Sequence, residues 1–325
     1  MVVTPATLPV APASIRPIVD GMASRTTKLM GGRATITVRG GPPHLLDEAF
    51  DLAHRCESLW SRFIPTSDIM RLNWSEGRPT TVDTLTASLI ATMMEGHYLS
   101  AGTFDPTVLP DVIAGGYDRS VPDPSRTTVL PDSARSPGRL LDVRIDGLEV
   151  CLPRGTTLDA GGVGKGATAD LVCDLVIAGG ATAVMAEIGG DIVVAGQGLR
   201  GPSWHLGIEN PFVDEQPAPL QPHVDVIRLV DGALATSSVR KRVFTVDGVP
   251  RHHLLDPATR RNADTDVQTV SVIAATGARA EMLTKAGFFI SHDEYLGWLP
   301  TVGAAGFIVL ADGTCRESAN WDQHR

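Results

Sequence analysis

The chain has 325 residues and a net charge of −9, with 43% hydrophobic and 20% charged residues. This ordinary globular composition can bury a sizeable core and argues against long disordered regions. The acidic balance and the aromatic content of only 5% argue against a general nucleic-acid partner, which needs a basic field and stacking side chains. A small phosphate-bearing ligand in a local cationic pocket remains compatible with this charge.

The cysteines and the N-terminus set the expected location and domain limits. The four cysteines are widely spaced and form no CxxC pair, so the sequence predicts neither a zinc site of that kind nor a disulfide framework. The first 14 residues are rich in Ala and Pro and lack the basic and apolar regions of a signal peptide. We therefore expect a mobile tail over residues 1–14, one domain over residues 15–325, a cytoplasmic location and no membrane partner.

Hydrophobic periodicity and turn residues divide the chain into elements. In chain order, we expect a strand over 29–38, helices over 44–63 and 84–99, and a surface excursion over 115–138. A hairpin over 143–152, a Gly-rich loop over 159–166 and a helix to about Ile177 follow. The remaining predictions are a strand pair within 182–195, a loop over 211–222, strands over 224–230, 242–247, 267–274 and 305–310, and a helix over 278–290. Because strands and helices mix without regular βαβ alternation, the sequence predicts an α+β fold.

The Gly-rich loop is the strongest local signal. Residues 158–170 read LDAGGVGKGATAD. The glycines let backbone amides approach a ligand, the helix N-terminus favours an anion, and Lys165 adds a charge for phosphate. The loop is not a P-loop, because Asp159 and Gly166 replace its first Gly and its Ser or Thr. Taken alone, the stretch is equally compatible with a tight turn that carries a solvated lysine.

Six further segments accompany this loop. They are LMGG at 29–32, SRF at 61–63 with Ser67, Leu72 and Asn73, GTFDPTV at 102–108, IGGD at 188–191, ATS at 235–237 and HLLDPAT at 253–259. In this order the segments resemble the ApbE-type FAD:protein FMN transferase family. The resemblance implies an α+β fold with a nucleotide cleft, and a reaction that moves FMN from FAD to a Ser or Thr hydroxyl of a target protein and releases AMP.

The resemblance also implies which residues bind the nucleotide. The implied binding residues are Met30, Phe104, Asp105, Asp159, Gly161, Gly162, Lys165, Gly189, Gly190, Asp191, Thr236 and Ser237. Lys165 and His253 are the implied catalytic residues, with His253 as the base for the acceptor hydroxyl, because imidazole titrates near neutral pH. Simpler interpretations stay open: Met30 and Phe104 as core residues, Asp105 as a turn residue, and His253 as a surface histidine.

One segment departs from the family pattern. The family's metal-binding helix reads ADALATA, whereas residues 280–286 read AEMLTKA. The metal-binding Asp falls on Glu281, the Thr ligand falls on Lys285, and a backbone carbonyl ligand falls near Gly164. A protonated lysine has no lone pair to offer, which puts the implied Mg²⁺ in doubt. Glu281 and Lys285 are also spaced for an exposed i,i+4 ion pair, and the sharper hypothesis is that Lys285 replaces part of the cation's charge.

Three functions follow from these patterns. The first is the FMN transfer itself, which the HLLDPAT segment favours. The second is a non-catalytic FAD-binding protein, a flavin carrier or regulator, which the altered metal helix favours. The third is an FAD pyrophosphatase, which needs only water as its acceptor.

Overall fold

The computed structural model describes residues 16–18, 21–120, 122–198, 201–214, 221–246 and 248–325. The predicted tail over residues 1–14 lies outside this part of the chain. None of the helices within these ranges combines the length and the apolar character needed to span a bilayer.

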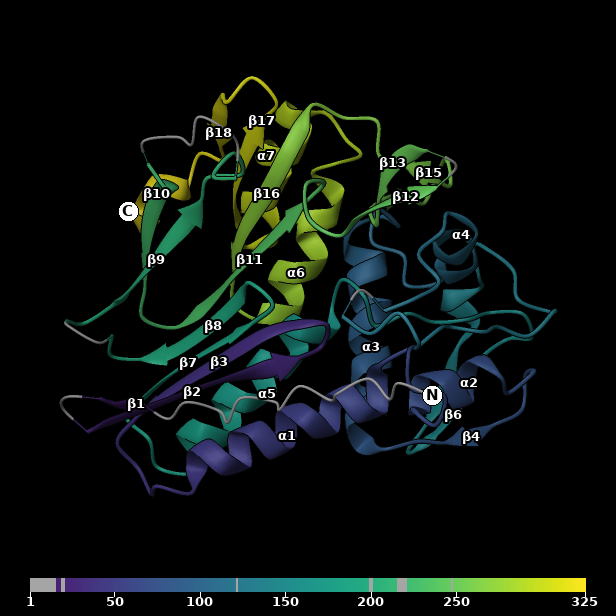
Figure 1. The fold of residues 1–325 in the computed structure, drawn as a ribbon, viewed down its shortest axis with the longest axis horizontal. Helices are drawn as coiled ribbons and strands as arrows, with labels where there is room; N and C mark the ends of the chain where they lie inside the picture. The colour runs from purple at the N-terminus through teal and green to yellow at the C-terminus, as the bar shows by residue number, and fades with distance from the viewer. Residues whose placement is uncertain (1–15, 19–20, 121, 199–200, 215–220, 247) are drawn as a thin grey trace, which may run out of the picture.

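A nine-stranded antiparallel sheet forms the centre of the fold (Figure 1). Its strands, in spatial order, are β1 (Arg16–Ile18), β2 (Met22–Leu29), β3 (Gly32–Arg39), β7 (Ala183–Ile188), β8 (Asp191–Gly196), β11 (Gly232–Ser238), β16 (Val267–Ala274), β17 (Ala305–Leu310) and β18 (Cys315–Glu317). Alternating side chains point to opposite faces of the sheet, so Ala233 and Ala235 join one core while Leu234 joins another.

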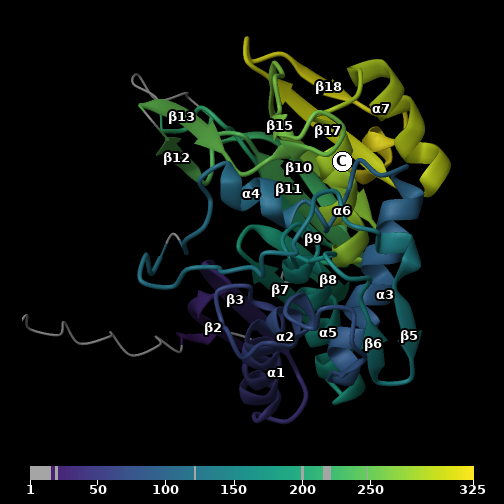
Figure 2. The ribbon, with the colours of Figure 1, turned by 90° about the vertical axis from the view of Figure 1, so that its right-hand side faces the viewer.

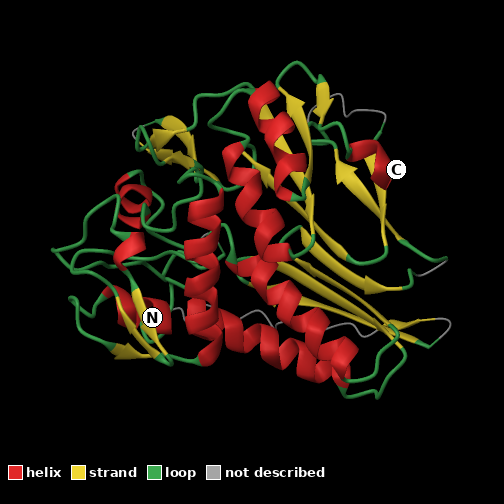
Figure 3. Cartoon of the chain, turned by 180° about the vertical axis from the view of Figure 1, so that it is seen from behind, coloured by secondary structure: helices red, strands yellow, loops and turns green. Residues whose placement is uncertain are grey.

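Helices cover one face of this sheet, as Figure 3 shows from behind. They are α1 (Leu45–Trp60), α5 (Gly164–Ala178), α6 (Gly277–Ala286) and α7 (His292–Trp298). The other face packs against the strand pair β9 (Trp204–Glu209) and β10 (His223–Leu229) and the short helix η3 (Trp321–His324). Trp204 and Trp321 are buried in that second core.

A second lobe lies beside the sheet and has its own apolar core. It contains α2 (Asp68–Asn73), α3 (Thr84–Leu99), α4 (Leu109–Ala114), η1 (Leu140–Asp142), β4 (Thr80–Thr81), β5 (Arg144–Asp146) and β6 (Glu149–Cys151). Figures 1 and 2 show the hairpin of β12 (Val243–Val246) and β13 (Val249–His252) beside α4. The remaining elements are β14 (Leu255–Asp256), β15 (Arg261–Asn262) and η2 (Leu299–Val302).

The structure confirms the α+β class and most of the predicted elements. The helix over 84–99 and the strands over 267–274 and 305–310 have the predicted bounds. The strand predicted over 29–38 is wrong at its start, because Met30 and Gly31 form the β2–β3 turn with positive φ angles of 49° and 74°. The helix predicted to Ile290 ends at Ala286. Part of the predicted loop, residues 215–220, and residue 247 of a predicted strand lie outside the described residues.

Candidate functional site

The residue that precedes the Gly-rich loop, Leu158, is held by two hydrogen bonds from one side chain, that of Asn73. Asn73 Oδ1 accepts a hydrogen bond from the Leu158 NH at 2.7 Å, and Asn73 Nδ2 donates to the Leu158 carbonyl at 2.9 Å. Both residues are buried. Gly162 then turns the chain with a positive φ of 92°, a conformation that favours glycine. The loop is therefore held by the α2 end of the second lobe.

The N-terminal ends of α5 and α6 touch through two glycines. A Cβ atom on Gly166 would lie 2.1 Å from the Gly277 carbonyl oxygen, so only glycine permits this approach. The contact brings Glu281 of α6 to the start of α5, where Glu281 Oε2 accepts a hydrogen bond from the Gly166 NH at 2.9 Å. Helix packing thereby inserts a carboxylate beneath the Gly-rich loop.

Lys165 joins two buried carboxylates from different elements. Its Nζ contacts Asp191 Oδ2 at the start of β8 and lies 3.0 Å from Glu281 Oε1. Asp191 is 1% exposed, and its Oδ1 accepts a hydrogen bond from the Thr236 NH at 3.2 Å. The structure thus brings together Lys165, Asp191 and Thr236, which the resemblance implies for nucleotide binding, and Glu281, which it implies for the metal.

Burial and mutual attraction set the pKa values in this cluster. Burial raises the pKa of Asp191, and the nearby Lys165 reduces the shift without cancelling it. Burial also acts to raise the pKa of Glu281, but Lys165 and Lys285 outweigh it and hold this pKa below its ordinary value. For Lys165, burial acts to lower the pKa, and the two carboxylates overcome it. Lys165 and Glu281 are therefore both charged at neutral pH.

Lys285 lies beside this cluster and binds hydroxyl groups. Its Nζ donates to Ser237 Oγ at 2.6 Å and to Thr284 Oγ1 at 3.2 Å. Within the described part of the chain it forms no ion pair shorter than 4 Å. The exposed ion pair predicted between Glu281 and Lys285 is wrong, because Glu281 is 1% exposed and pairs with Lys165 instead. Burial lowers the pKa of Lys285 to about 8.

The predicted magnesium ligands do not form a divalent-cation site. The Gly164 carbonyl accepts a hydrogen bond from Thr168 Oγ1 at 2.7 Å within α5. Both oxygens of Glu281 are engaged by Lys165 and by the Gly166 NH. Among the residues that the structure describes, no group of three His, Cys, Asp or Glu side chains is arranged to hold a metal ion. The donor set therefore does not fit Mg²⁺, which prefers several oxygen ligands in octahedral geometry.

Thr236, Ser237 and the IGGD glycines complete the cluster. Thr236 Oγ1 and Ser271 Oγ lie 2.8 Å apart, and Ser237 Oγ lies 2.7 Å from Thr284 Oγ1. Gly189 and Gly190 turn between β7 and β8 with φ angles of 60° and 94°. A Cβ on Gly189 would lie 3.0 Å from Lys165 Cδ, so the lysine stem runs against this turn.

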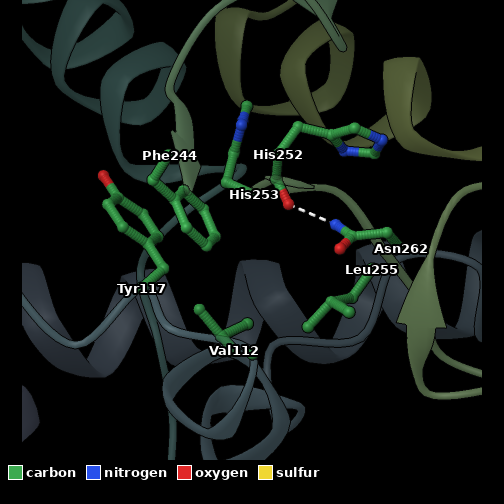
Figure 4. A pocket seen from close by; sticks show the side chains of 8 residues that line it. Val112, Tyr117, Phe244, His252, His253, Leu255 and Asn262 are labelled. Atoms are coloured by element: carbon green, nitrogen blue, oxygen red, sulfur yellow. Dashed lines mark hydrogen bonds between the residues drawn. The ribbon is translucent and has the colours of Figure 1, made fainter. Parts of the chain in front are cut away.

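His253 lines a small aromatic pocket between α4 and the β12–β13 hairpin. The lining residues are Val112, Gly115, Tyr117, Phe244, His252, His253, Leu255 and Asn262. Figure 4 shows the rings of Tyr117 and Phe244 side by side, and they stack with centroids 5.6 Å apart at 14°. His253 is half-buried, and its Nδ1 atom is buried without a hydrogen-bond partner among the described residues, so the imidazole is not freely exposed.

The pKa of His253 lies well below its ordinary value. Burial is the main cause, and the positive charges of Arg242, Lys285 and Lys165 add to it. The imidazole is consequently neutral at neutral pH and is able to accept a proton. The same interactions show that His253 lies within electrostatic reach of the lysine cluster.

The three residues implied for the flavin or adenine region have clear local roles. Phe104 is 3% exposed, and its ring lies 3.4 Å from where a Cβ on Gly162 would be. The Met30 NH donates to Glu57 Oε1 at 2.8 Å, and Met30 packs against both apolar cores. Asp105 Oδ1 accepts from the Thr107 NH at 2.8 Å, which forms a turn. Their contact with a nucleotide stays a prediction.

Arg62 is a buried residue of the site that the sequence did not single out. Its Nε lies 3.3 Å from Asp159 Oδ2, while Asp159 Oδ1 accepts from the Gly161 NH at 2.9 Å. The guanidinium carbon lies 4.2 Å and 4.8 Å from the ring centroids of Phe63 and Tyr117. Arg62 thus connects the Gly-rich loop to the aromatic pocket. In the sequence, Arg62 belongs to the SRF segment and receives no role, because Asp159 and Tyr117 are distant in sequence.

Arg242 is the second such residue. It lies in the turn between β11 and β12 with a positive φ of 54° and is half-buried. Its side chain makes no ion pair or hydrogen bond within the described ranges. Its charge lowers the pKa of His253 and acts on Lys165 and Lys285. The segment after the ATS motif therefore contributes a cation that has no ion-pair partner among the described residues.

Comparison with known proteins identifies the family. A model described as the ApbE family matches residues 30–307. The FAD:protein FMN transferase of Treponema pallidum is 28% identical over 294 residues, which cover 84% of this chain and 79% of that protein. The FAD:protein FMN transferase of Vibrio cholerae is 29% identical over 244 residues, which cover 72% of this chain and 69% of that protein.

Solved structures have the same fold. The ApbE protein of Thermotoga maritima superimposes with a TM-score of 0.81 at 26% identity, covering 93% of this chain and 99% of that chain. The flavin transferase ApbE from Vibrio cholerae gives a TM-score of 0.76 at 22% identity, covering 97% and 100%. With a family model that covers most of its length, this chain belongs to the ApbE family.

Proposed function

We propose that the protein transfers the FMN part of FAD to a serine or threonine hydroxyl of a target protein and releases AMP. The observation that carries this proposal is the neutral, buried imidazole of His253 within electrostatic reach of two lysines at a Gly-rich loop. The named activity of relatives that are 28% and 29% identical supports it. A base for the hydroxyl proton and positive charge at the phosphate groups both accelerate phosphoryl-group transfer to a hydroxyl.

The reaction balances without a covalent enzyme intermediate. The acceptor hydroxyl oxygen attacks the phosphorus of the FMN part, and a new P–O bond forms. The bond from that phosphorus to the bridging oxygen breaks, and its electron pair leaves with AMP. The hydroxyl proton moves to the imidazole of His253, whose low pKa keeps it unprotonated beforehand. Lys165 stabilises negative charge on the phosphate oxygens as the leaving group departs.

The neighbours of Lys165 hold this charge in place. Asp191 and Glu281 bind the ammonium from two sides, and the Gly189 turn supports its stem. The backbone of the Gly-rich loop and the N-terminus of α5 offer further NH donors to an anion. A preorganised cation of this kind stabilises a developing charge without having to move during the reaction.

The test is to incubate the purified protein with FAD and a soluble extract of its own organism. AMP is measured by chromatography, and covalent flavin by fluorescence of a denaturing gel. Transfer predicts AMP and a fluorescent protein band in equal amounts. AMP formed without any acceptor protein would instead indicate an FAD pyrophosphatase.

A second candidate is a flavin carrier or regulatory protein that binds FAD without turning it over. The specific observation in its favour is the misfit of the predicted magnesium ligands, because Lys285 occupies the metal helix. This function predicts saturable FAD binding with neither AMP nor a fluorescent band. The same experiment therefore separates the two candidates.

A further inference from the structure

Among the residues that the structure describes, no carboxylate forms an ion pair with the ammonium group of Lys285. Its described polar contacts are the hydroxyl groups of Ser237 and Thr284. The carboxylate nearest to it along α6, Glu281, binds Lys165 and the Gly166 NH instead. Lys285 is half-buried, and its ammonium group has no carboxylate within 4 Å among the described residues.

The stem of Lys285 runs directly beneath the Gly-rich loop. A Cβ on Gly162 would lie 2.9 Å from Lys285 Cε, so glycine at this position makes room for the lysine. On the other side of the cluster, the stem of Lys165 lies against the Gly189 turn in the same way. The stems of two lysines therefore lie against two glycine turns, at positions where any larger residue would collide with them.

The charges in the cluster are unequal in number. Lys165, Lys285 and Arg242 act on one another, and the carboxylates grouped with them are those of Asp191 and Glu281. Counted formally, these five side chains carry three positive and two negative charges, in a chain whose net charge is −9. A local excess of this kind attracts a small anion and repels a divalent cation.

We propose that Lys285, together with Lys165 and Arg242, takes the place of the divalent cation in this chain, so that the diphosphate of a flavin dinucleotide binds without metal. This inference rests on the proposed function, because it assumes FAD as the ligand. In this proposal the three basic side chains neutralise the two phosphate groups. A lysine has three donors, and Lys285 uses two of them for Ser237 and Thr284, so one is left for a phosphate oxygen. Arg242 adds a planar fork of donors.

The experiment titrates FAD into the purified protein and follows FAD fluorescence, once with EDTA and once with Mg²⁺. The inference predicts dissociation constants that agree within about twofold. FAD binding that occurs only with stoichiometric Mg²⁺ would overturn the inference and leave the proposed function standing. Absence of FAD binding under both conditions would overturn both.

Variants of Lys285 test the role of its charge. Lys285→Met keeps the length of the side chain and should weaken FAD binding at least tenfold in EDTA. The loss should be larger at low salt than at high salt, because salt screens the attraction between the cationic site and the anionic nucleotide. Lys241→Met is the matched control, since Lys241 pairs with Glu209 on the surface, and it should change binding less than twofold. Equal binding by the two variants would contradict the inference.

Two further variants separate the charge from the fold. Glu281→Asp combined with Lys285→Thr restores the ligand types of the family's metal helix, and FAD binding by this double variant should become dependent on Mg²⁺.

Gly162→Ala should displace Lys285 and weaken FAD binding. Gly180→Ala carries the same strain, since the φ angles are 92° and 95°, but meets no atom within 4 Å and should bind FAD normally. Thermal unfolding of each variant confirms that it is folded.

Discussion

Asp170 of α5 accepts a hydrogen bond from the backbone NH of Gly277 at 2.6 Å, and its second oxygen accepts from the Ala278 NH at 2.9 Å. The last acidic residue of the Gly-rich motif is therefore an N-terminal cap of α6. A carboxylate at a helix N-terminus satisfies free NH groups and interacts favourably with the helix dipole. This cap fixes the angle between the two helices that deliver Lys165 and Glu281.

The Asp170 cap makes stability depend on pH. Burial raises the pKa of Asp170 from 3.8 to about 6, although the two NH donors oppose the shift. The folded state therefore binds more protons than the unfolded state between these values, and this contribution to stability is lost as pH rises. Relative to Asp170→Asn, the wild type should lose up to about 3 kcal/mol of unfolding free energy between pH 4 and pH 7.

Urea unfolding of both proteins at several pH values measures this difference, and other titrating groups cancel in the comparison. Above about pH 7 the two curves should run parallel. A difference that stays constant across the whole range, or one that grows as the pH rises, would show that the carboxyl group is not protonated in the folded protein.

Arg62 should contribute far more to stability than an ordinary surface arginine. Arg62→Ala removes the partner of Asp159 and the ring contacts to Phe63 and Tyr117, and we expect a loss of about 2–4 kcal/mol. Arg126→Ala is the control, because Arg126 and Asp123 form an exposed ion pair, and it should cost less than about 1 kcal/mol. Chemical denaturation compares the two, and similar losses would contradict the structural role of Arg62.

His253→Ala should abolish transfer and spare binding. We expect a decrease in AMP release of about 10²–10⁴-fold, the usual contribution of a general base, with the FAD dissociation constant within about threefold of wild type. Because burial and nearby cations lower the pKa of His253, the wild-type rate should show no inflection from this group between pH 6 and pH 8. His54→Ala, an exposed position in α1, is the control. Parallel loss of binding and turnover would indicate a structural histidine.

The parts of the fold that could be predicted are those whose signals are local. The helix over 84–99 begins at a capping residue, Asp83, whose side chain accepts a hydrogen bond from the Leu85 NH at 3.0 Å. The strand over 305–310 is a continuous apolar run, and the strand over 267–274 is rich in β-branched residues; each has a neighbouring strand on both sides. In each case neighbouring residues carry the information, so sequence and structure agree on the bounds.

The parts that could not be predicted depend on distant contacts. Glu281 and Lys285 have the spacing of a helical ion pair, but Glu281 pairs with Lys165 from another helix instead. Nothing local to Arg62 indicates that Asp159 and Tyr117 will surround it. The sequence motifs therefore predicted which residue types the site contains. Which of them form pairs depends on how α5 and α6 pack against each other.

The crossing of α5 and α6 provides the sharpest test of this arrangement. In Gly166→Ala, the new methyl group would lie 2.1 Å from the Gly277 carbonyl oxygen and 2.7 Å from the Ala278 nitrogen, both backbone atoms.

Backbone atoms cannot move aside as a flexible side chain can, so the helices must separate, and we expect a loss of about 3 kcal/mol or more. Separation also withdraws Glu281 from Lys165, so FAD binding should weaken in parallel. Gly164→Ala, two residues earlier in the same helix, meets its nearest atom at 3.4 Å and should alter stability by less than about 1 kcal/mol. If both variants unfold at the same urea concentration, the two helices do not cross at Gly166 and Gly277 as described.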